Sequence, residues 1–296
     1  MNVRIKFALA AASALALGLS ACGSNSLSGA PAGSSAPSVS VSQNADLASK
    51  LPANIRSAGV IKVGTDASYA PSEFLAGDGK TVQGFDVDVF NAVAAKFGVK
   101  AAFQPADFAA IITGVQGQKY DIGVSSFTIN ADRLKQVNMV SYFSAGTQWA
   151  TAPGNPKAVE AKNACGKNVA VQTGTVQETD DLPVRQKACG SAKIKILSFK
   201  NQSEATSAVA TGKADAMLAD SPVVAYAVKQ SGGKIEALGD VYQAAPYGYV
   251  VPKAETEFAA ALAEALKEIK ADGSYQAALA KWGVEQGAIT DFAVNP

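Results

Sequence analysis

The chain has 296 residues, with 26 Lys+Arg against 25 Asp+Glu and no histidine. The charge balance provides no basic surface for nucleic acid, and the lack of histidine excludes Ser-His-Asp catalysis and His-ligated metal sites. We therefore predict no catalytic residue, no cofactor, no metal site and no nucleic-acid partner.

The N-terminal residues have the pattern of an export signal. Two cations precede an apolar run, Phe7–Leu19, which is shorter than the roughly 20 residues of a membrane-spanning helix and typical of a cleaved signal. The run leads into Leu19-Ser20-Ala21-Cys22, which resembles a bacterial lipobox. We expect residues 1–21 to be removed and Cys22 to carry a lipid anchor on the extracytoplasmic face of the cell envelope, with a buried N-terminal helix as the alternative.

Residues 22–45 are mostly Ser, Gly, Ala and Pro, with almost no charge or aromatic ring. Such a segment buries too little apolar surface to offset its ordering entropy, so it is predicted to be a flexible tether. The residues that follow are numerous enough for one large core or for two domains.

Beyond the tether, short apolar strands alternate with segments whose apolar residues recur at helical spacing. The predicted elements are, in chain order, strand Val60–Val63, a helix capped by Asp86 or Asp88 and stopped at Gly98, a helix from about Asp107, strand Ile122–Val124, strand Asn168–Val171, a helix over Ser203–Ala210, strand Ala216–Leu218, a long helix over Glu255–Ala271 and an amphipathic turn over Tyr275–Trp282. This order is typical of parallel sheets covered by helices. Because the pattern recurs in the second half, we interpret the fold as two α/β lobes of similar plan.

Two cysteines remain after Cys22. Outside the cytoplasm Cys165 and Cys189 are expected to form a disulfide, rather than two free thiols.

Open α/β sheets bind ligands just beyond the carboxyl ends of their strands. Polar side chains gather at four such ends, and the candidates are Asp66, Tyr69, Ser125, Ser126, Thr128, Gln172, Thr175, Val176 and Asp220. Hydroxyls, an amide, two carboxylates and an aromatic ring suit a small polar ligand. Core packing of Tyr69, and ordinary loop roles for Ser125 and Ser126, are the alternatives.

Arg133 adds a cation to this set, because a guanidinium in a polar cleft binds a carboxylate through paired bonds. Asp220 could accept hydrogen bonds from an ammonium, so the two would recognise both charged ends of a free α-amino acid. A surface ion pair is the alternative for Arg133. For Asp220 it is a helix N-cap before Ser221-Pro222.

Several ordered motifs carry a resemblance to a known family. They are Val63-Gly64-Thr65-Asp66-Ala67-Ser68-Tyr69-Ala70-Pro71, Gly84-Phe85-Asp86-Val87-Asp88, Lys119-Tyr120-Asp121, Ser125-Ser126-Phe127-Thr128-Ile129, Val169-Ala170-Val171-Gln172-Thr173-Gly174-Thr175 and Asp272-Gly273-Ser274-Tyr275. Together they resemble the polar amino-acid family of bacterial periplasmic-type solute-binding proteins, the receptor subunits of ABC importers.

The resemblance implies a role for each candidate. Tyr69 and Phe108 would sandwich the ligand. Arg133 would hold the α-carboxylate with Thr128 and the Val176 backbone N–H. Asp220, with the groups at Ser126 and Thr128, would take the α-ammonium, and Asp66 and Gln172 would contact the ligand's side chain.

Three positions depart from the family's pattern. Ser72 replaces a usual Phe, which puts the apolar wall of the pocket in question. At Val176 only the backbone can serve the ligand. Gln172 stands where some binders of acidic or amide ligands carry Lys, so a neutral or polar amino acid is favoured over glutamate.

The implied fold is a two-lobed periplasmic-binding-protein fold with a two-crossing hinge. Lobe 1 would comprise residues 46–146 and 247–296, and lobe 2 residues 147–246. The expected protein is a monomer that captures an amino acid and delivers it to an ABC transporter permease. A dehydratase-like enzyme acting on a small carboxylate, and a surface lipoprotein for sensing or adhesion, are the rival functions.

Overall fold

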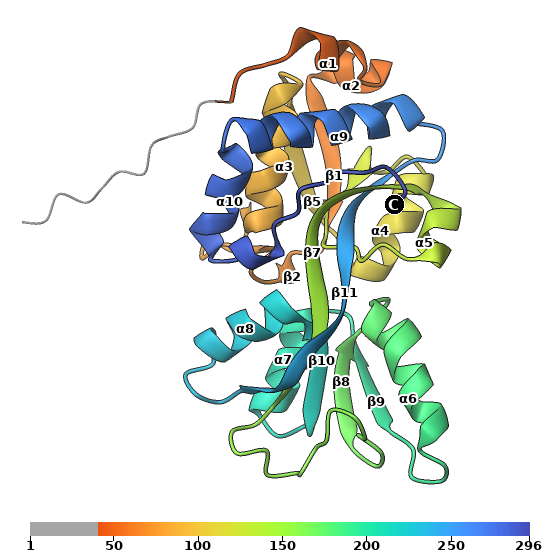
Figure 1. Ribbon diagram of the computed structural model, residues 1–296, viewed down its shortest axis with the longest axis vertical. Helices are drawn as coiled ribbons and strands as arrows, with labels where there is room; N and C mark the ends of the chain where they lie inside the picture. Colours follow the sequence, from red (N-terminus) through yellow and green to blue (C-terminus); the bar gives the residue numbers. More distant parts are fainter. Residues whose placement is uncertain (1–40) are drawn as a thin grey trace, which may run out of the picture. The chain divides into compact units, whose positions relative to one another are not determined.

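Two long antiparallel strands at the centre of the molecule connect two α/β lobes. The computed structural model describes residues 41–296, and the connecting strands are β7 (Asn138–Thr151) and β11 (Glu236–Val251) (Figure 1). The first lobe holds α1 (Ala45–Ser49), α2 (Ala53–Ala58), β1 (Val60–Thr65), β2 (Ser68–Tyr69), β3 (Glu73–Leu75), β4 (Val82–Gln83), α3 (Phe85–Lys96), β5 (Lys100–Pro105), α4 (Phe108–Gln116), β6 (Ile122–Gly123), α5 (Ala131–Gln136), α9 (Thr256–Ala271), α10 (Ser274–Trp282) and the short turn η2 (Glu285–Gly287). The second holds β8 (Asn168–Gln172), the π-helix η1 (Gln177–Asp181), α6 (Leu182–Ala188), β9 (Lys195–Phe199), α7 (Gln202–Ala210), β10 (Ala216–Asp220) and α8 (Ser221–Gln230).

The main sheet is mixed. Its strand order is β5-β1-β6-β11-β7-β10-β8-β9, with parallel trios at the two ends and antiparallel β7 and β11 between them. The expectation of parallel sheets is therefore right for the outer strands and wrong for the centre. The carboxyl ends of parallel strands lie at the same edge of a sheet. The loops after β1, β6, β8 and β10 therefore all face the space between the lobes.

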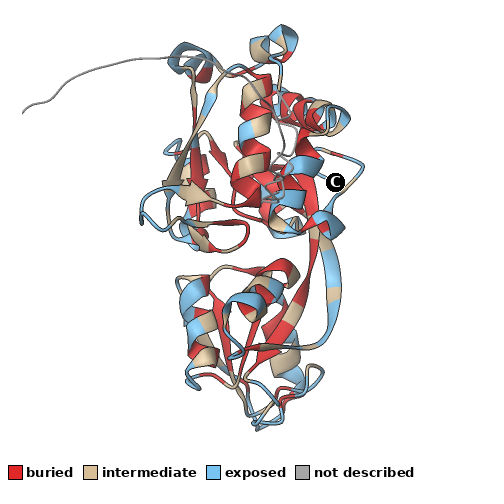
Figure 2. Cartoon of the chain, turned by 90° about the vertical axis from the view of Figure 1, so that its left-hand side faces the viewer, coloured by how far each residue is buried: buried red, intermediate tan, exposed pale blue. Residues whose placement is uncertain are grey.

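Helices cover the sheet through apolar stripes, as the sequence periodicity predicts. In α9, the residues at helical spacing, among them Phe258, Leu262, Leu266 and Ile269, are all buried, and Tyr275 of α10 joins the same core. Figure 2 shows the same division, with buried residues in the strands and on the inner sides of the helices.

The start of α3 differs from the prediction. Neither Asp86 nor Asp88 caps it, because the helix begins at Phe85 and Gly84 occupies the N-cap position. Gly84 has φ 142°, and a Cβ there would lie 2.0 Å from the carbonyl oxygen of Ser72. Only glycine fits this backbone position, and its placement frees Asp86 for a different role.

The predicted crossings lie midway along the two central strands, where Ala145 pairs with Ala245 and Ser144 with Pro246. The β7–β11 pairing loses its register on either side of this point, between Tyr242 and Ala245 and between Tyr247 and Gly248. Interrupted ladder pairing allows local bending, so these residues remain our predicted hinge.

The folded part begins before Asp46, the predicted start of lobe 1. Asn44 caps α1 through its side chain and donates a hydrogen bond to Glu268 of α9 at 2.5 Å. The predicted signal and Cys22 lie outside the described residues. Within residues 41–296 no helix combines the length and apolarity needed to cross a bilayer.

Cys165 and Cys189 form a disulfide in the second lobe. It encloses a loop with a sequence separation of 24 residues and packs beside the core around Trp149 and Leu182. Closing a loop of this length restricts the unfolded chain by about 3 kcal/mol in the chain-entropy description.

Candidate functional site

Most of the predicted site residues meet from both lobes around a small cavity. Its volume is about 10 Å³, which holds about one water molecule. The lining residues are Tyr69, Phe108, Ser126, Thr128 and Arg133 from the first lobe and Thr175, Val176, Gln177 and Asp220 from the second. An amino acid can therefore enter only if the lobes separate.

Arg133 is buried beside the cavity and does not form a surface ion pair. Its guanidinium donates to the carbonyl oxygens of Thr128 at 2.6 Å and Gly174 at 3.0 Å and lies 5.4 and 5.3 Å from the ring centroids of Phe108 and Phe127. None of the ion pairs among residues 41–296 includes Arg133. Of five guanidinium N–H donors, two are used in these bonds, and the others have no hydrogen-bond acceptor among residues 41–296.

Burial of the guanidinium lowers the pKa of Arg133 to about 10. The side chain still carries its charge at neutral pH. A charged group so removed from water gains more from an added carboxylate than an exposed one would, because the local dielectric is lower.

Asp220 ends β10 and stands at the N-cap position of α8, but its side chain does not cap the helix. The carboxylate instead accepts hydrogen bonds from the Tyr69 hydroxyl at 2.8 Å and from the Gln177 side-chain amide at 2.7 Å. Burial raises the pKa of Asp220, and these donors oppose the rise. The N-cap alternative for Asp220 is therefore only partly right. Its backbone occupies the N-cap position of α8, but its carboxylate does not cap the helix and lines the cavity instead.

Three predicted residues lie beside the cavity and do not line it. The Gln172 amide donates to the Asp66 carboxylate and to the carbonyl oxygen of Lys200 at 3.0 Å, while the Ser125 hydroxyl accepts from the Asp66 backbone N–H at 2.9 Å. Burial raises the pKa of Asp66. Ser72 is also buried away from the cavity, so the missing aromatic ring leaves no gap in its wall.

Comparisons with known proteins agree with this geometry. Residues 61–285 match the bacterial extracellular solute-binding proteins, family 3. An arginine-binding protein of Corynebacterium glutamicum is 37% identical over 253 residues, which cover 84% of this chain and 83% of that protein.

The chain belongs to family 3 of the bacterial extracellular solute-binding proteins.

Solved structures show the same two-lobed fold. An ancestral arginine-binding protein bound to arginine has a TM-score of 0.70 and 34% identity, covering 76% of this chain and 98% of that one. An ancestral amino-acid-binding protein, described as a precursor of cyclohexadienyl dehydratase, has a TM-score of 0.69 and 33% identity, covering 77% of this chain and 97% of that one.

Two residues at the site of this solute-binding protein were not predicted from the sequence, Gln177 and Phe127. Gln177 is buried in η1 and donates to Thr147 of β7 at 3.0 Å as well as to Asp220. The Phe127 ring stacks on Phe108 with centroids 4.4 Å apart and faces the Arg133 guanidinium. A polar residue two positions after Thr175 was the available signal for Gln177, whereas Phe127 looked like ordinary core.

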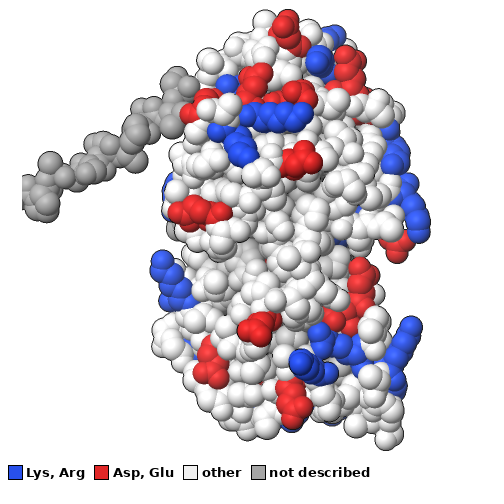
Figure 3. Space-filling view, in the orientation of Figure 1, with Lys and Arg blue, Asp and Glu red and all other residues white. Residues whose placement is uncertain are grey.

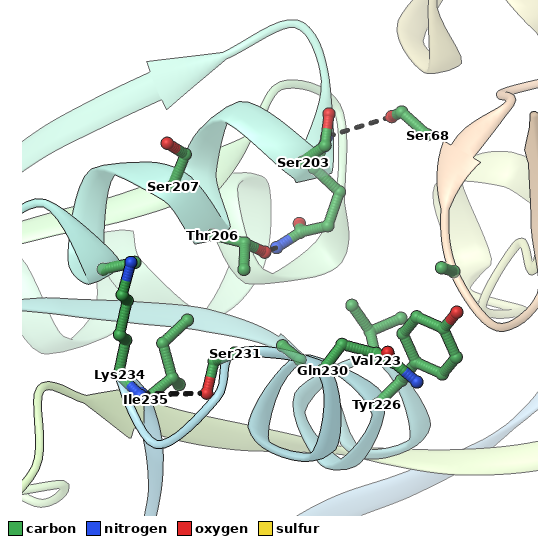
Figure 4. Close-up of a pocket in the computed structure, with 14 residues that line it drawn as sticks. Ser68, Ser203, Thr206, Ser207, Val223, Tyr226, Gln230, Ser231, Lys234 and Ile235 are labelled. Atoms are coloured by element: carbon green, nitrogen blue, oxygen red, sulfur yellow. Dashed lines mark hydrogen bonds between the residues drawn. The ribbon is translucent and has the colours of Figure 1, made fainter. Parts of the chain in front are cut away.

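Two larger cavities flank the inner one. A cavity of about 400 Å³ is lined by Asp66, Asp107 and Asn201, among others, and Asp107 forms an ion pair with Lys200 at 3.3 Å. A second, of about 380 Å³, lies between α7 and α8 (Figure 4) and is lined by apolar side chains such as Val223 and by polar ones such as Thr206 and Gln230. Near it, the Gln202 backbone N–H donates to the Ser68 hydroxyl at 3.1 Å and joins the lobes.

Charges on the surface do not form a single-sign patch on the face in Figure 3, where acidic and basic side chains are interspersed. Asp66, Arg133 and Asp220 are buried charged residues at the cavities between the lobes.

Proposed function

We propose that this solute-binding protein captures a free α-amino acid between its lobes, prefers a cationic side chain, and delivers the ligand as a monomer to the permease of an ABC importer. The observation that carries the proposal is the pairing of opposite charges across one cavity, with Arg133 on the first lobe and Asp220 on the second. An α-amino acid presents a carboxylate and an ammonium a few bonds apart. Only a ligand that contacts both lobes stabilises their closed arrangement.

Binding requires exchange of existing contacts. The ammonium would replace the Tyr69 hydroxyl and the Gln177 amide as donors to Asp220, and the carboxylate would take the free donors of Arg133. Each new bond joins two opposite charges, whereas the bonds that it replaces at Asp220 join one charge to a neutral donor, so the ligand adds a Coulombic attraction. This difference would offset the separation of the lobes that admits the ligand.

The cationic preference rests on Asp66. Within residues 41–296 its buried carboxylate accepts hydrogen bonds from neutral donors alone, those of Ser68 and Gln172. It also lines the larger cavity beside Asp107, whose own charge is paired with Lys200. A lysine, ornithine or arginine side chain extending this way would meet an anion already removed from water. The neutral or polar ligand expected from Gln172 remains the competing prediction, and the arginine-binding relatives support the cationic one.

Replacement of Asp66 by asparagine tests the preference. We expect arginine affinity to fall at least about tenfold, or 1.4 kcal/mol, while glutamine affinity changes little, because the amide keeps the shape and removes only the charge. Calorimetry with arginine, lysine, ornithine, glutamine, histidine and glutamate measures this, after a melting screen in which ligand at 100 times its Kd adds about 2.7 kcal/mol. Exposed Asp240, changed to Asn, is the matched control.

The competing outcomes separate the hypotheses. Tighter binding of glutamine than of arginine by the unchanged protein would reject the cationic preference but keep amino-acid capture. A screen without any stabilising solute would favour the sensing or adhesion role. Conversion of a small carboxylate into product would favour the dehydratase-like enzyme, whereas we propose that no bond is made or broken.

We also propose that a lipid on Cys22 holds the protein at the extracytoplasmic face of the membrane. A Cys22→Ser variant is expected to move from the membrane fraction to the soluble fraction and to lose incorporated palmitate. Retention of the variant in the membrane fraction would rule out the lipid anchor.

A further inference from the structure

Two buried carboxyl groups lie directly behind the site, Glu73 on β3 and Asp86 on α3. Both are fully buried. Asp86 Oδ2 accepts from the Ser126 backbone N–H at 2.8 Å, from the Ser126 hydroxyl at 3.2 Å and from the Tyr142 hydroxyl at 2.6 Å. Glu73 Oε1 accepts from the Ser125 hydroxyl at 2.8 Å.

The two remaining carboxyl oxygens, Glu73 Oε2 and Asp86 Oδ1, find no donor among the side chains and backbone of residues 41–296. The two carboxyl groups are hydrogen-bonded to the adjacent residues Ser125 and Ser126, and a hydrogen bond between the two unpaired oxygens would satisfy both of them. Two carboxylates cannot form such a bond, because neither carries a hydrogen. Such a bond therefore requires a proton on one of the two groups.

The surroundings assign that proton to Glu73. Asp86 accepts three bonds from protein donors, which favour its charged form, whereas Glu73 accepts one. No ion pair within residues 41–296 involves either group. The titratable groups that face the pair are Asp66, Tyr69, Tyr142 and Tyr249, and none of them supplies a positive charge.

We infer that Glu73 and Asp86 form a proton-sharing acid–carboxylate pair that positions the ligand-contacting loop Ser125–Ser126 and the start of the Asp66 loop. Glu73 donates through Oε2–H to Asp86 Oδ1. Both are positioning residues, since neither lines the cavity. This inference rests on the proposed function for its binding readout.

The contacts explain how the pair reaches the ligand. Ser126, which lines the cavity, has a left-handed backbone with φ 49°, a conformation that costs energy for a non-glycine residue and is held here by its two bonds to Asp86. Ser125 connects Glu73 to the Asp66 loop, because its hydroxyl donates to Glu73 and accepts from the Asp66 backbone N–H.

The proton on Glu73 determines how stability and ligand affinity change with pH. Burial, followed by the charge of Asp86, raises the pKa of Glu73 well above its ordinary value. The stability contributed by the protonated form is fully present below the unfolded-state pKa and is lost as pH rises through the folded-state pKa. Above that point two buried carboxylates repel each other, and affinity is expected to fall by up to about tenfold per pH unit.

A Glu73→Gln variant tests the pair. Its amide can donate to Asp86 and accept from Ser125 but cannot lose a proton. With L-arginine as the probe, we expect a Kd at neutral pH within about threefold of the unchanged protein and a shallower alkaline loss of affinity. Deprotonation of the arginine α-ammonium affects all proteins equally, so the difference in slope is the readout. Exposed Glu257→Gln should keep the original slope.

Infrared spectroscopy gives a second readout that needs no ligand. The carbonyl stretch of a protonated carboxyl group should be present at neutral pH in the unchanged protein and in Glu257→Gln, and should be lost in Glu73→Gln. An unaltered band or an unaltered pH slope in Glu73→Gln would overturn the inference. If no amino acid binds the unchanged protein, the proposed function fails while the infrared result still decides on the pair.

Discussion

Replacement of Arg133 by alanine is expected to abolish amino-acid binding while leaving the protein folded. The guanidinium is the cation of the cavity, and its free N–H donors would hold the ligand carboxylate in the proposed complex. Truncation of one partner of a buried charged pair costs about 2 to 5 kcal/mol, so affinity should fall at least about 30-fold. The exchange also removes two bonds to backbone carbonyls, and modest destabilisation should accompany it.

Titration calorimetry and thermal melting measure the two effects separately. Arg56→Ala, at an exposed position on α2, is the matched control and should bind normally. Arg133→Lys should recover only part of the affinity, because an ammonium lacks the paired planar donors of a guanidinium. Unchanged affinity in a folded Arg133→Ala protein would refute the carboxylate clamp.

Replacement of Asp220 by asparagine should also weaken binding at least about 30-fold, by the same range of energies. Its effect on stability should be the opposite of that at Arg133. Burial disfavours the carboxylate and raises the pKa of Asp220, so the neutral amide removes a desolvation cost. It can still accept from Tyr69, and the melting temperature without ligand should stay equal or rise.

The pH dependence of binding provides an independent check on Asp220. A protonated carboxyl group cannot pair with the ligand ammonium, so affinity for a neutral amino acid such as glutamine should fall as pH drops through the raised pKa of Asp220. Asp220→Asn should lose this acid dependence, and the exposed control Asp240→Asn should retain it. A strong acid dependence that persists in Asp220→Asn would assign the titration to another group.

Local sequence patterns predicted the outer elements of the fold well. In α3 and α9 the apolar residues recur at helical spacing because one side of each helix packs on the sheet. Short apolar runs located β1, β8 and β10 because parallel strands covered on both faces lack polar alternation.

The same patterns failed for β7 and β11. β7 is buried along nearly all of its length, and β11 is largely exposed in the second lobe and buried in the first. Neither strand therefore has a single periodicity from end to end. Their antiparallel pairing joins residues about 100 positions apart, such as Ser144 and Pro246, and such a contact leaves no local trace.

For the site, the sequence by itself determined which chemical groups stand at the strand ends, among them Ser126, Asp220 and Asp66. This was possible because chain direction alone places those ends on one edge of a parallel sheet. Only the tertiary structure decided which groups share a cavity and which lie behind it. Asp220 is turned toward Tyr69 and Gln177, and Glu73 meets Asp86, through contacts between distant segments, whose geometry depends on packing of the whole body and not on any spacing along the chain.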